Sequence, residues 1–102
     1  MKACYKVWLE SENGKFILGE GTADLLHAVE EKGSISEAAR QLHISYAHAW
    51  RKIRTIEKNS GRRVLERTKG GKTGGSSELT DEGKVLLQKY DKIKDTLEKA
   101  LH

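Results

Sequence analysis

Hydrophobic and polar residues alternate near the N-terminus of the chain, as in a strand that buries one of its faces. Over residues 3–9, the side chains of Tyr5, Val7 and Leu9 fall on one side of this alternation. An Asn-Gly pair follows, which is a strong short-range signal for a hairpin turn, and a second apolar run returns after it. The pattern predicts an N-terminal β-hairpin over residues 3–18.

After this hairpin the apolar residues recur every three or four positions, which is the spacing of amphipathic helices. The first helix is expected from Thr22, a residue type that caps helices, to about Lys32. A second, short helix is expected from about Glu37 to Leu42, opened by Ser36. Its alanines would let a crossing helix approach closely.

A third helix is predicted to begin after a turn at His43 and Ile44, with Ser45 as its cap, and to last until about Ser60, before Gly61. One face of this helix is apolar, and the opposite face is polar and cationic. The apolar face consists of Tyr46, Ala49, Trp50, Ile53 and Ile56. A short helix, a tight turn and a longer helix form a helix-turn-helix, here over residues 36–60.

The segment after this motif predicts a wing, which is a β-hairpin over residues 64–79 with a glycine-rich tip. A final helix follows over residues 80–101 and carries a heptad-like apolar seam. This seam predicts a homodimer, and packing of the seam against the core of the same chain is the alternative. The proposed dimer contacts are Leu86, Tyr90, Ile93, Leu97 and Leu101, with Trp8 of the hairpin.

These elements predict a mainly α (α+β) fold, a winged helix-turn-helix in which residues 1–102 form one domain. With 36% hydrophobic and 33% charged residues, the composition suits a globular domain, and no apolar run approaches the roughly 20 residues of a membrane helix. The single cysteine, Cys4, cannot form an internal disulfide, so we expect a cytoplasmic protein without membrane contact.

Charge is segregated along the chain, whose formal net charge is +4. Residues 40–72 hold ten Lys or Arg against two acids, an excess of +8, whereas the other nine basic and thirteen acidic residues give −4. Because the basic segment coincides with the helix-turn-helix, we expect a cationic surface that binds DNA rather than an ordinary solvated surface.

The exposed face of the third helix is the candidate reading surface. Arg51 is the first choice for base contacts, because a guanidinium can bond guanine O6 and N7 together, and His48 and Ser45 come next. Basic residues around the helix would meet phosphates, and the wing lysines would add charge. For the aromatic rings of Tyr46 and Trp50 we favour packing against the core over stacking on bases. The candidate DNA-binding residues are Ser45, Tyr46, Ala47, His48, Arg51, Lys52, Thr55, Lys58, Arg62, Arg63, Lys69 and Lys72.

The chain resembles the DNA-binding domain of molybdate-dependent transcriptional regulators of the ModE type. The resemblance is carried by the run Gly33–Arg40, the Ser-Tyr-x-x-Ala-Trp pattern of residues 45–50, the double-glycine wing and the Leu-Thr-Asp-Glu-Gly run of residues 79–83. It covers the chain from about Val7 to Tyr90. The Gly-Ser-Ile-Ser-x-Ala-Ala part is also similar to LysR-type regulators.

The resemblance implies a dimer formed through the N-terminal strands and the last helix, bound to a palindromic operator near genes for molybdenum or tungsten uptake or use. Two departures stand out. Ala47 occupies a position where the family usually has a basic residue, and the family's molybdate-binding domains do not follow the last helix in this sequence. We therefore expect no direct oxyanion binding by this chain.

Other function classes fit the sequence less well. No nucleophile signature is present, and Gly71-Lys72-Thr73 lacks the upstream strand and glycine of a phosphate-binding loop, so we expect no enzyme and no cofactor. The histidines and Cys4 are scattered, and we expect no metal site. Two alternatives remain on the same fold: a non-specific, chromatin-like DNA-coating protein and a protein-interaction module.

Overall fold

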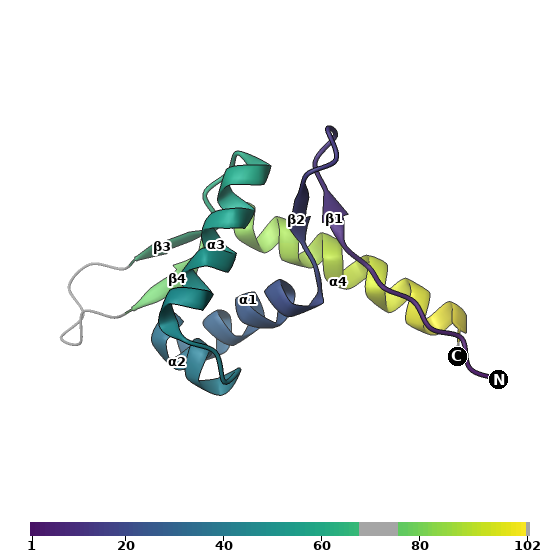
Figure 1. The fold of residues 1–102 in the computed structure, drawn as a ribbon, viewed down its shortest axis with the longest axis horizontal. Helices are drawn as coiled ribbons and strands as arrows, with labels where there is room; N and C mark the ends of the chain where they lie inside the picture. Colours follow the sequence, from purple (N-terminus) through teal and green to yellow (C-terminus); the bar gives the residue numbers. More distant parts are fainter. Residues whose placement is uncertain (68–75, 102) are drawn as a thin grey trace.

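The computed structural model describes residues 1–67 and 76–101, and within them the chain forms helices and two separate two-stranded antiparallel hairpins (Figure 1). The elements, in chain order, are β1 (Leu9–Glu10), β2 (Phe16–Leu18), α1 (Glu20–Lys32), α2 (Ile35–Gln41), α3 (Tyr46–Ser60), β3 (Leu65–Arg67), β4 (Ser77–Leu79) and α4 (Asp81–Leu101). The predicted winged helix-turn-helix is confirmed. The candidate wing residues Lys69 and Lys72 lie outside the described residues.

One hydrophobic core joins the helices. Its fully buried side chains come from β2, α1, α2, α3 and the segment before β3, and are Leu18, Leu25, Leu26, Val29, Ile35, Ile53, Ile56 and Val64. Ala38 and Ala39 of α2 and Ala49 of α3 are also buried, as expected where two helices cross closely. His43 has a positive φ of 58°, which turns the chain sharply between α2 and α3.

The ends of α3 agree with the sequence prediction. The Ser45 hydroxyl accepts a hydrogen bond of 3.0 Å from the backbone N–H of His48, which is the bond that defines an N-cap. At the other end Gly61 has a φ of 71° and its N–H donates to the Glu57 carbonyl. The helix that carries the candidate site is therefore fixed at both ends by its own sequence.

The predicted starts of α1 and α2 were wrong by two residues or fewer. α2 begins at Ile35 rather than Glu37, and its cap is Ser34, whose hydroxyl accepts from the N–H of Glu37. α1 begins at Glu20, so Thr22 lies inside the first turn and its hydroxyl accepts from the N–H of Gly19. Several residues near each helix start are of types that cap helices. In α2 the earlier serine, Ser34, is the cap, because burial of Ile35 places that residue in the first turn of the helix.

The N-terminal strand is shorter than the alternation predicted. β1 contains two residues and pairs with β2 through an irregular register, and residues 1–8 form no strand. The alternation appears instead in burial, because Tyr5 and Val7 are half-buried whereas Trp8 is 52% exposed. This segment runs beside α4, and the Tyr5 hydroxyl donates to the Glu98 carboxylate over 3.1 Å (Figure 1).

The base of the wing is fastened to the body of the molecule. The N–H of Ser77 donates to the Gly33 carbonyl, and the N–H of Thr80 donates to the Val64 carbonyl. At Gly83 the first turn of α4 passes so close to this segment that a Cβ would lie 2.4 Å from the Val64 oxygen. The wing strands are therefore placed by backbone contacts and by the absence of a side chain at one position.

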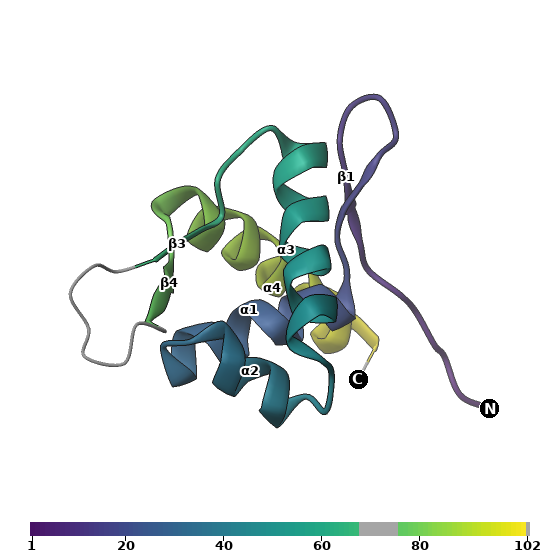
Figure 2. The same ribbon diagram turned by 60° about the vertical axis from the view of Figure 1, so that its left-hand side comes forward.

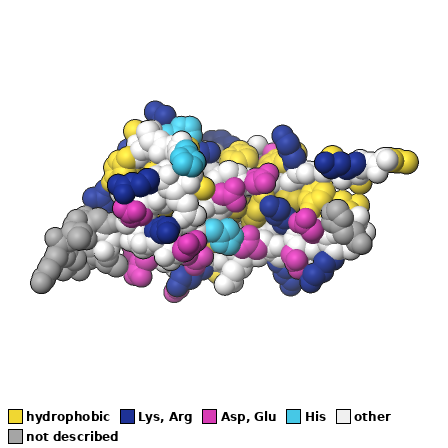
Figure 3. All heavy atoms as spheres, turned by 90° about the horizontal axis from the view of Figure 1, so that it is seen from below, with side chains coloured by type: hydrophobic (Ala, Val, Ile, Leu, Met, Phe, Trp, Pro, Cys, Tyr) yellow, Lys and Arg dark blue, Asp and Glu magenta, His cyan; other side chains and the backbone are white. Residues whose placement is uncertain are grey.

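The molecule measures 51 × 30 × 22 Å. The C-terminal half of α4 projects from its body (Figures 1 and 2). Tyr90 is only 2% exposed, so the expectation that its ring lies in an intermolecular seam is replaced by packing within its own chain. Beyond it, Ile93 and Leu101 are 40% and 44% exposed. Figure 3 shows hydrophobic side chains gathered at this elongated end.

In the part of the chain that the structure describes, no helix is both long enough and apolar enough to cross a membrane.

Candidate nucleic-acid interface

Helix α3 stands between the wing hairpin and the N-terminal hairpin (Figure 1), and one side of it carries exposed polar residues. Ala47, Arg51, Thr55 and Lys58 are all exposed on this side. Their spacing of four, four and three residues places them in one stripe along the helix. Half-buried His48 lies next to Ala47 in the helix and completes a set of five candidate residues. We call these five residues the reading stripe.

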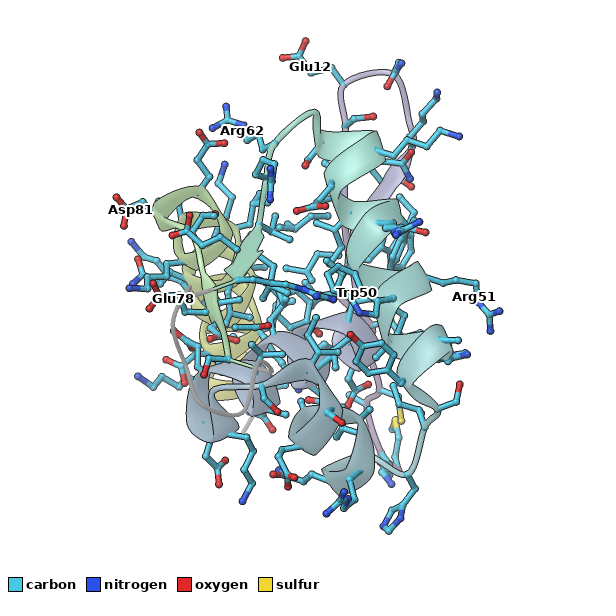
Figure 4. The ribbon with its side chains drawn as sticks, turned by 90° about the vertical axis from the view of Figure 1, so that its left-hand side faces the viewer. Glu12, Trp50, Arg51, Arg62, Glu78 and Asp81 are labelled. Atoms are coloured by element: carbon cyan, nitrogen blue, oxygen red, sulfur yellow. The ribbon has the colours of Figure 1, made fainter. Side chains whose placement is uncertain are left out.

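Arg51 is an exposed basic residue near the middle of the reading stripe. Its side chain projects away from the body of the molecule (Figure 4). The contact of its guanidinium with Nδ1 of His48 is long, at 3.5 Å, and no carboxylate of residues 1–67 or 76–101 forms an ion pair with it. The Thr55 hydroxyl donates to the Arg51 carbonyl and keeps its lone pairs for an outside donor. The stripe thus offers both donors and acceptors.

The remaining basic candidates do not all lie beside Arg51. Arg62 and Arg63 are exposed in the segment after α3, and a guanidinium nitrogen of Arg62 lies 4.0 Å from the Glu82 carboxylate. Lys52 is half-buried and turned toward the start of α1, where its ammonium lies near Gly21. The structure therefore brings Lys58 together with Arg51 but directs Lys52 to a different side of the helix.

The aromatic residues of α3 are more accessible than the sequence predicted. Ala49, Ile53 and Ile56 are buried as expected, whereas Tyr46 is 47% exposed and Trp50 is half-buried. Each residue step turns a side chain by about 100°, so Trp50 lies at the edge of the buried stripe and faces the wing. The two rings meet edge to face, with centroids 6.3 Å apart.

Two arginines that the sequence analysis did not select gather on these rings. The Cζ atoms of Arg54 and Arg67 lie 5.8 Å and 5.2 Å from the centroid of the Trp50 ring, which are cation–π distances. Arg67 also donates a hydrogen bond of 3.0 Å to the Tyr46 hydroxyl. We call Tyr46, Trp50, Arg54 and Arg67 the aromatic–arginine cluster. The four-residue spacing of Trp50 and Arg54 was the signal that could have identified half of it.

A cavity of about 350 Å³ lies on the other side of α3, between the N-terminal segment, α1 and α4. Trp8, Phe16, Lys52 and Tyr90 contribute to its walls. Burial raises the pKa of Tyr90, and desolvation followed by the hydrogen bond to Glu98 raises the pKa of Tyr5, so both phenols are neutral near pH 7. Among the described residues no cluster of His, Cys, Asp or Glu has the arrangement of a metal site.

Comparison with known proteins agrees with this geometry. The chain is 42% identical over 78 residues to the transcriptional regulator ModE of Haemophilus influenzae, which is 76% of this chain and 31% of that protein. It is 40% identical over 76 residues to the DNA-binding transcriptional dual regulator ModE of Escherichia coli K12, which is 74% of this chain and 29% of that protein. The predicted similarity to ModE-type regulators is confirmed, and the chain spans about three tenths of the length of these relatives.

Among solved structures, the DNA-binding domain of CbnR in complex with DNA superimposes with a TM-score of 0.63 at 26% identity, covering 78% of this chain and 86% of that domain. Residues 23–84, from α1 through the first turn of α4, match the bacterial regulatory helix-turn-helix proteins of the lysR family. The chain belongs to the lysR family of bacterial regulatory helix-turn-helix proteins.

Proposed function

We propose that the chain is a transcriptional regulator that binds double-stranded DNA in a sequence-specific manner. The observation that carries this proposal is the reading stripe of α3, in which Arg51 projects outward from a helix-turn-helix and has no carboxylate partner among the described residues. The match to regulatory helix-turn-helix proteins and the likeness to a domain solved on DNA support it. Within this proposal the chain acts in the cytoplasm and has no catalytic role.

In this proposal α3 enters the major groove of a duplex. The Arg51 guanidinium donates to O6 and N7 of a guanine, which contributes roughly 1–3 kcal/mol of discrimination against other bases. Thr55 and His48 lie close enough along the helix to contact neighbouring base edges. Lys58, Arg62 and Arg63 lie nearer the end of α3, where they would meet phosphates and fix the position of the helix.

We further propose that two copies of the chain act together. The surface proposed for their contact consists of the exposed side chains of Trp8, Ile93 and Leu101, with half-buried Leu97. A dimer built on this surface is two-fold symmetric and would place two copies of α3 about one turn of DNA apart, roughly 34 Å. Its operator would then be an inverted repeat.

The regulated genes are proposed from the relatives. The relatives include regulators named ModE and a molybdenum transport protein of Azotobacter vinelandii that is 35% identical over 77 residues. We propose that this chain controls genes for molybdate or tungstate transport or metabolism. The similarity lies in the DNA-binding part, so it supports a shared kind of operator more directly than a shared effector.

Selection of duplexes from a random pool tests the proposal. The pool is bound to the purified chain at moderate salt, and the retained duplexes are sequenced. Their sequences are compared with those from a control pool that is processed in the same way without protein. We expect an inverted repeat whose half-sites lie about one helical turn apart. Enrichment of no motif, with equal affinity for all duplexes, would instead support a non-specific DNA-coating protein. Absence of any DNA binding would support a protein-interaction module.

A further inference from the structure

We propose that the aromatic–arginine cluster is a phosphate-binding site at the junction of α3 and the wing, in which Trp50 positions Arg54 and Arg67 against the DNA backbone. This inference rests on the proposed function and deepens it, because it assigns a contact that the reading stripe does not contain. The cluster joins residues of α3 with one residue of β3 that lies 13 positions after Arg54 in the chain. Only the folded wing brings these side chains together.

The geometry of the cluster fixes both guanidinium groups. Each lies within 6 Å of the Trp50 centroid, so their Cζ atoms are within about 11 Å of each other. Trp50 is half-buried and is held by the body of the protein, whereas both arginines are exposed. The Tyr46 hydroxyl fixes Arg67 at a second point. The ring therefore serves as a support for the cations, and its buried edge leaves it poorly placed to stack on a DNA base.

The cluster also leaves positive charge uncompensated. In residues 1–67 and 76–101, no carboxylate forms an ion pair with Arg54 or Arg67, whereas Arg40 lies 3.5 Å from Glu37 and Arg62 lies 4.0 Å from Glu82. An aromatic ring and a phenol orient a guanidinium without neutralising it, and they occupy few of its five N–H donors. The remaining donors suit the planar, two-point recognition of a phosphate.

The position of the cluster suits a backbone phosphate better than a base. Arg54 lies three residues after Arg51 on α3, on the side where Arg67 of β3 shares the Trp50 ring with it. When Arg51 faces the floor of the groove, Arg54 and Arg67 face one of its walls, where each strand carries one phosphate for roughly every 3.4 Å of axis. Because the ring restricts both flexible side chains before DNA arrives, less conformational entropy is lost on binding.

Fluorescence anisotropy with labelled duplexes, measured across a range of salt concentrations, tests this inference. The variants are Arg54→Gln, Arg67→Gln and Trp50→Leu, with Lys92→Gln on α4 as a control for the loss of one positive charge. Each arginine variant should weaken binding to the selected operator and to a scrambled duplex by the same factor. It should also make the negative slope of log affinity against log salt shallower by about 0.9, and Lys92→Gln should leave the slope unchanged.

A double-variant cycle separates positioning by Trp50 from a general structural role. If Trp50 acts through Arg54 and Arg67, then adding Trp50→Leu to the Arg54→Gln, Arg67→Gln double variant should weaken DNA binding hardly any further. Trp50→Phe, which keeps an aromatic face, should recover part of the affinity lost in Trp50→Leu. Circular dichroism confirms that each variant is folded at the temperature of the titration, and Arg67→Lys provides a milder variant that should bind with intermediate affinity.

Three results would overturn the inference. Unchanged salt slopes in both arginine variants would show that neither residue meets a phosphate. A loss confined to one base position of the operator would indicate a base contact instead. An undiminished loss from Trp50→Leu when Arg54 and Arg67 are both replaced would show that Trp50 does not act through these arginines. In each case the wild-type chain still binds its operator, so failure here is distinct from failure of the proposed function, in which the wild-type chain selects no motif.

Discussion

Neighbouring basic residues of α3 face different partners, because each step along a helix turns the side chain by about 100°. Arg51 projects into the solvent, Lys52 turns toward the start of α1, and Arg54 lies over the ring of Trp50. Three basic residues within four positions thus have three separate environments. For a single residue, the direction of its side chain therefore says more about its partner than the density of basic residues around it in the sequence.

Helical spacing predicted the direction of some of these residues and not of others. The buried positions of Ala49, Ile53 and Ile56 follow from periodicity alone. The contact of Tyr46 with the wing depends on where β3 passes, since Arg67 of that strand donates a hydrogen bond to the Tyr46 hydroxyl. No local pattern records the approach of a strand that follows in the sequence, so the contacts of Arg67 with Trp50 and Tyr46 could not be predicted from spacing.

Two glycines in the first turns of helices give a sharp test of packing at single residues. Gly83→Ala should lower the free energy of unfolding by about 1–3 kcal/mol, because its Cβ would lie 2.4 Å from the Val64 carbonyl oxygen. Gly21→Ala is the matched control, since its Cβ would meet only the flexible end of Lys52 at 3.5 Å. It should be neutral or stabilising by up to about 1 kcal/mol.

Chemical denaturation followed by circular dichroism measures both glycine variants. Equal stability of Gly83→Ala and the wild-type chain would contradict the close approach of α4 to the Val64 segment.

Among the elements, α3 was the most predictable and the N-terminal hairpin the least. Ser45 and Gly61 mark the ends of α3 in the sequence, and the structure places its caps at those residues. The N-terminal alternation predicted a long strand, but only Leu9 and Glu10 find a pairing partner in β2. A strand needs a partner as well as an alternating pattern, and the residues before Leu9 pack along α4 instead.

The cap of α3 allows the stability of this helix to be separated from its role in DNA binding. Ser45→Ala should lower the free energy of unfolding by about 0.5–2 kcal/mol, because the N–H of His48 loses its partner. Ser45→Asp should keep that stability, since aspartate caps helices well, but should weaken DNA binding about tenfold or more through repulsion of the duplex. Thermal melting and anisotropy titration measure the two effects.

A Ser45→Asp variant that binds DNA like the wild-type chain would show that the start of α3 does not approach the duplex.

Over the whole molecule, the basic helix-turn-helix and the apolar side chains of the proposed dimer surface lie on different elements. The basic segment of residues 40–72 contains α3, whereas Trp8 lies in the N-terminal segment and Ile93 and Leu101 lie in the far half of α4. The seam predicted along α4 is divided between two roles, since Tyr90 packs within its own chain and Ile93 remains exposed. Periodicity identified the apolar positions of α4. It could not show that the core ends near Tyr90, because that depends on which other elements pack against the helix.

The proposed dimer surface is tested by placing a charge on it. Ile93→Asp should raise the dimer dissociation constant about tenfold or more, because burying this side chain contributes roughly 1.5–3 kcal/mol. Val85→Asp is the control, since Val85 is 59% exposed on the same helix but lies eight residues nearer to the wing. Analytical ultracentrifugation measures both, and equal dissociation constants for the two variants would count against the surface.

Sequence-specific binding depends above all on Arg51 reading a base from the exposed side of α3. The most direct test is the ratio of the affinity for the selected operator to the affinity for a scrambled duplex, measured at one salt concentration for the wild-type chain and for Arg51→Ala. We expect the substitution to lower this ratio about 10- to 100-fold while the affinity for the scrambled duplex changes little. An unchanged ratio, or an equal fall of both affinities, would contradict the assignment of α3 as the reading helix.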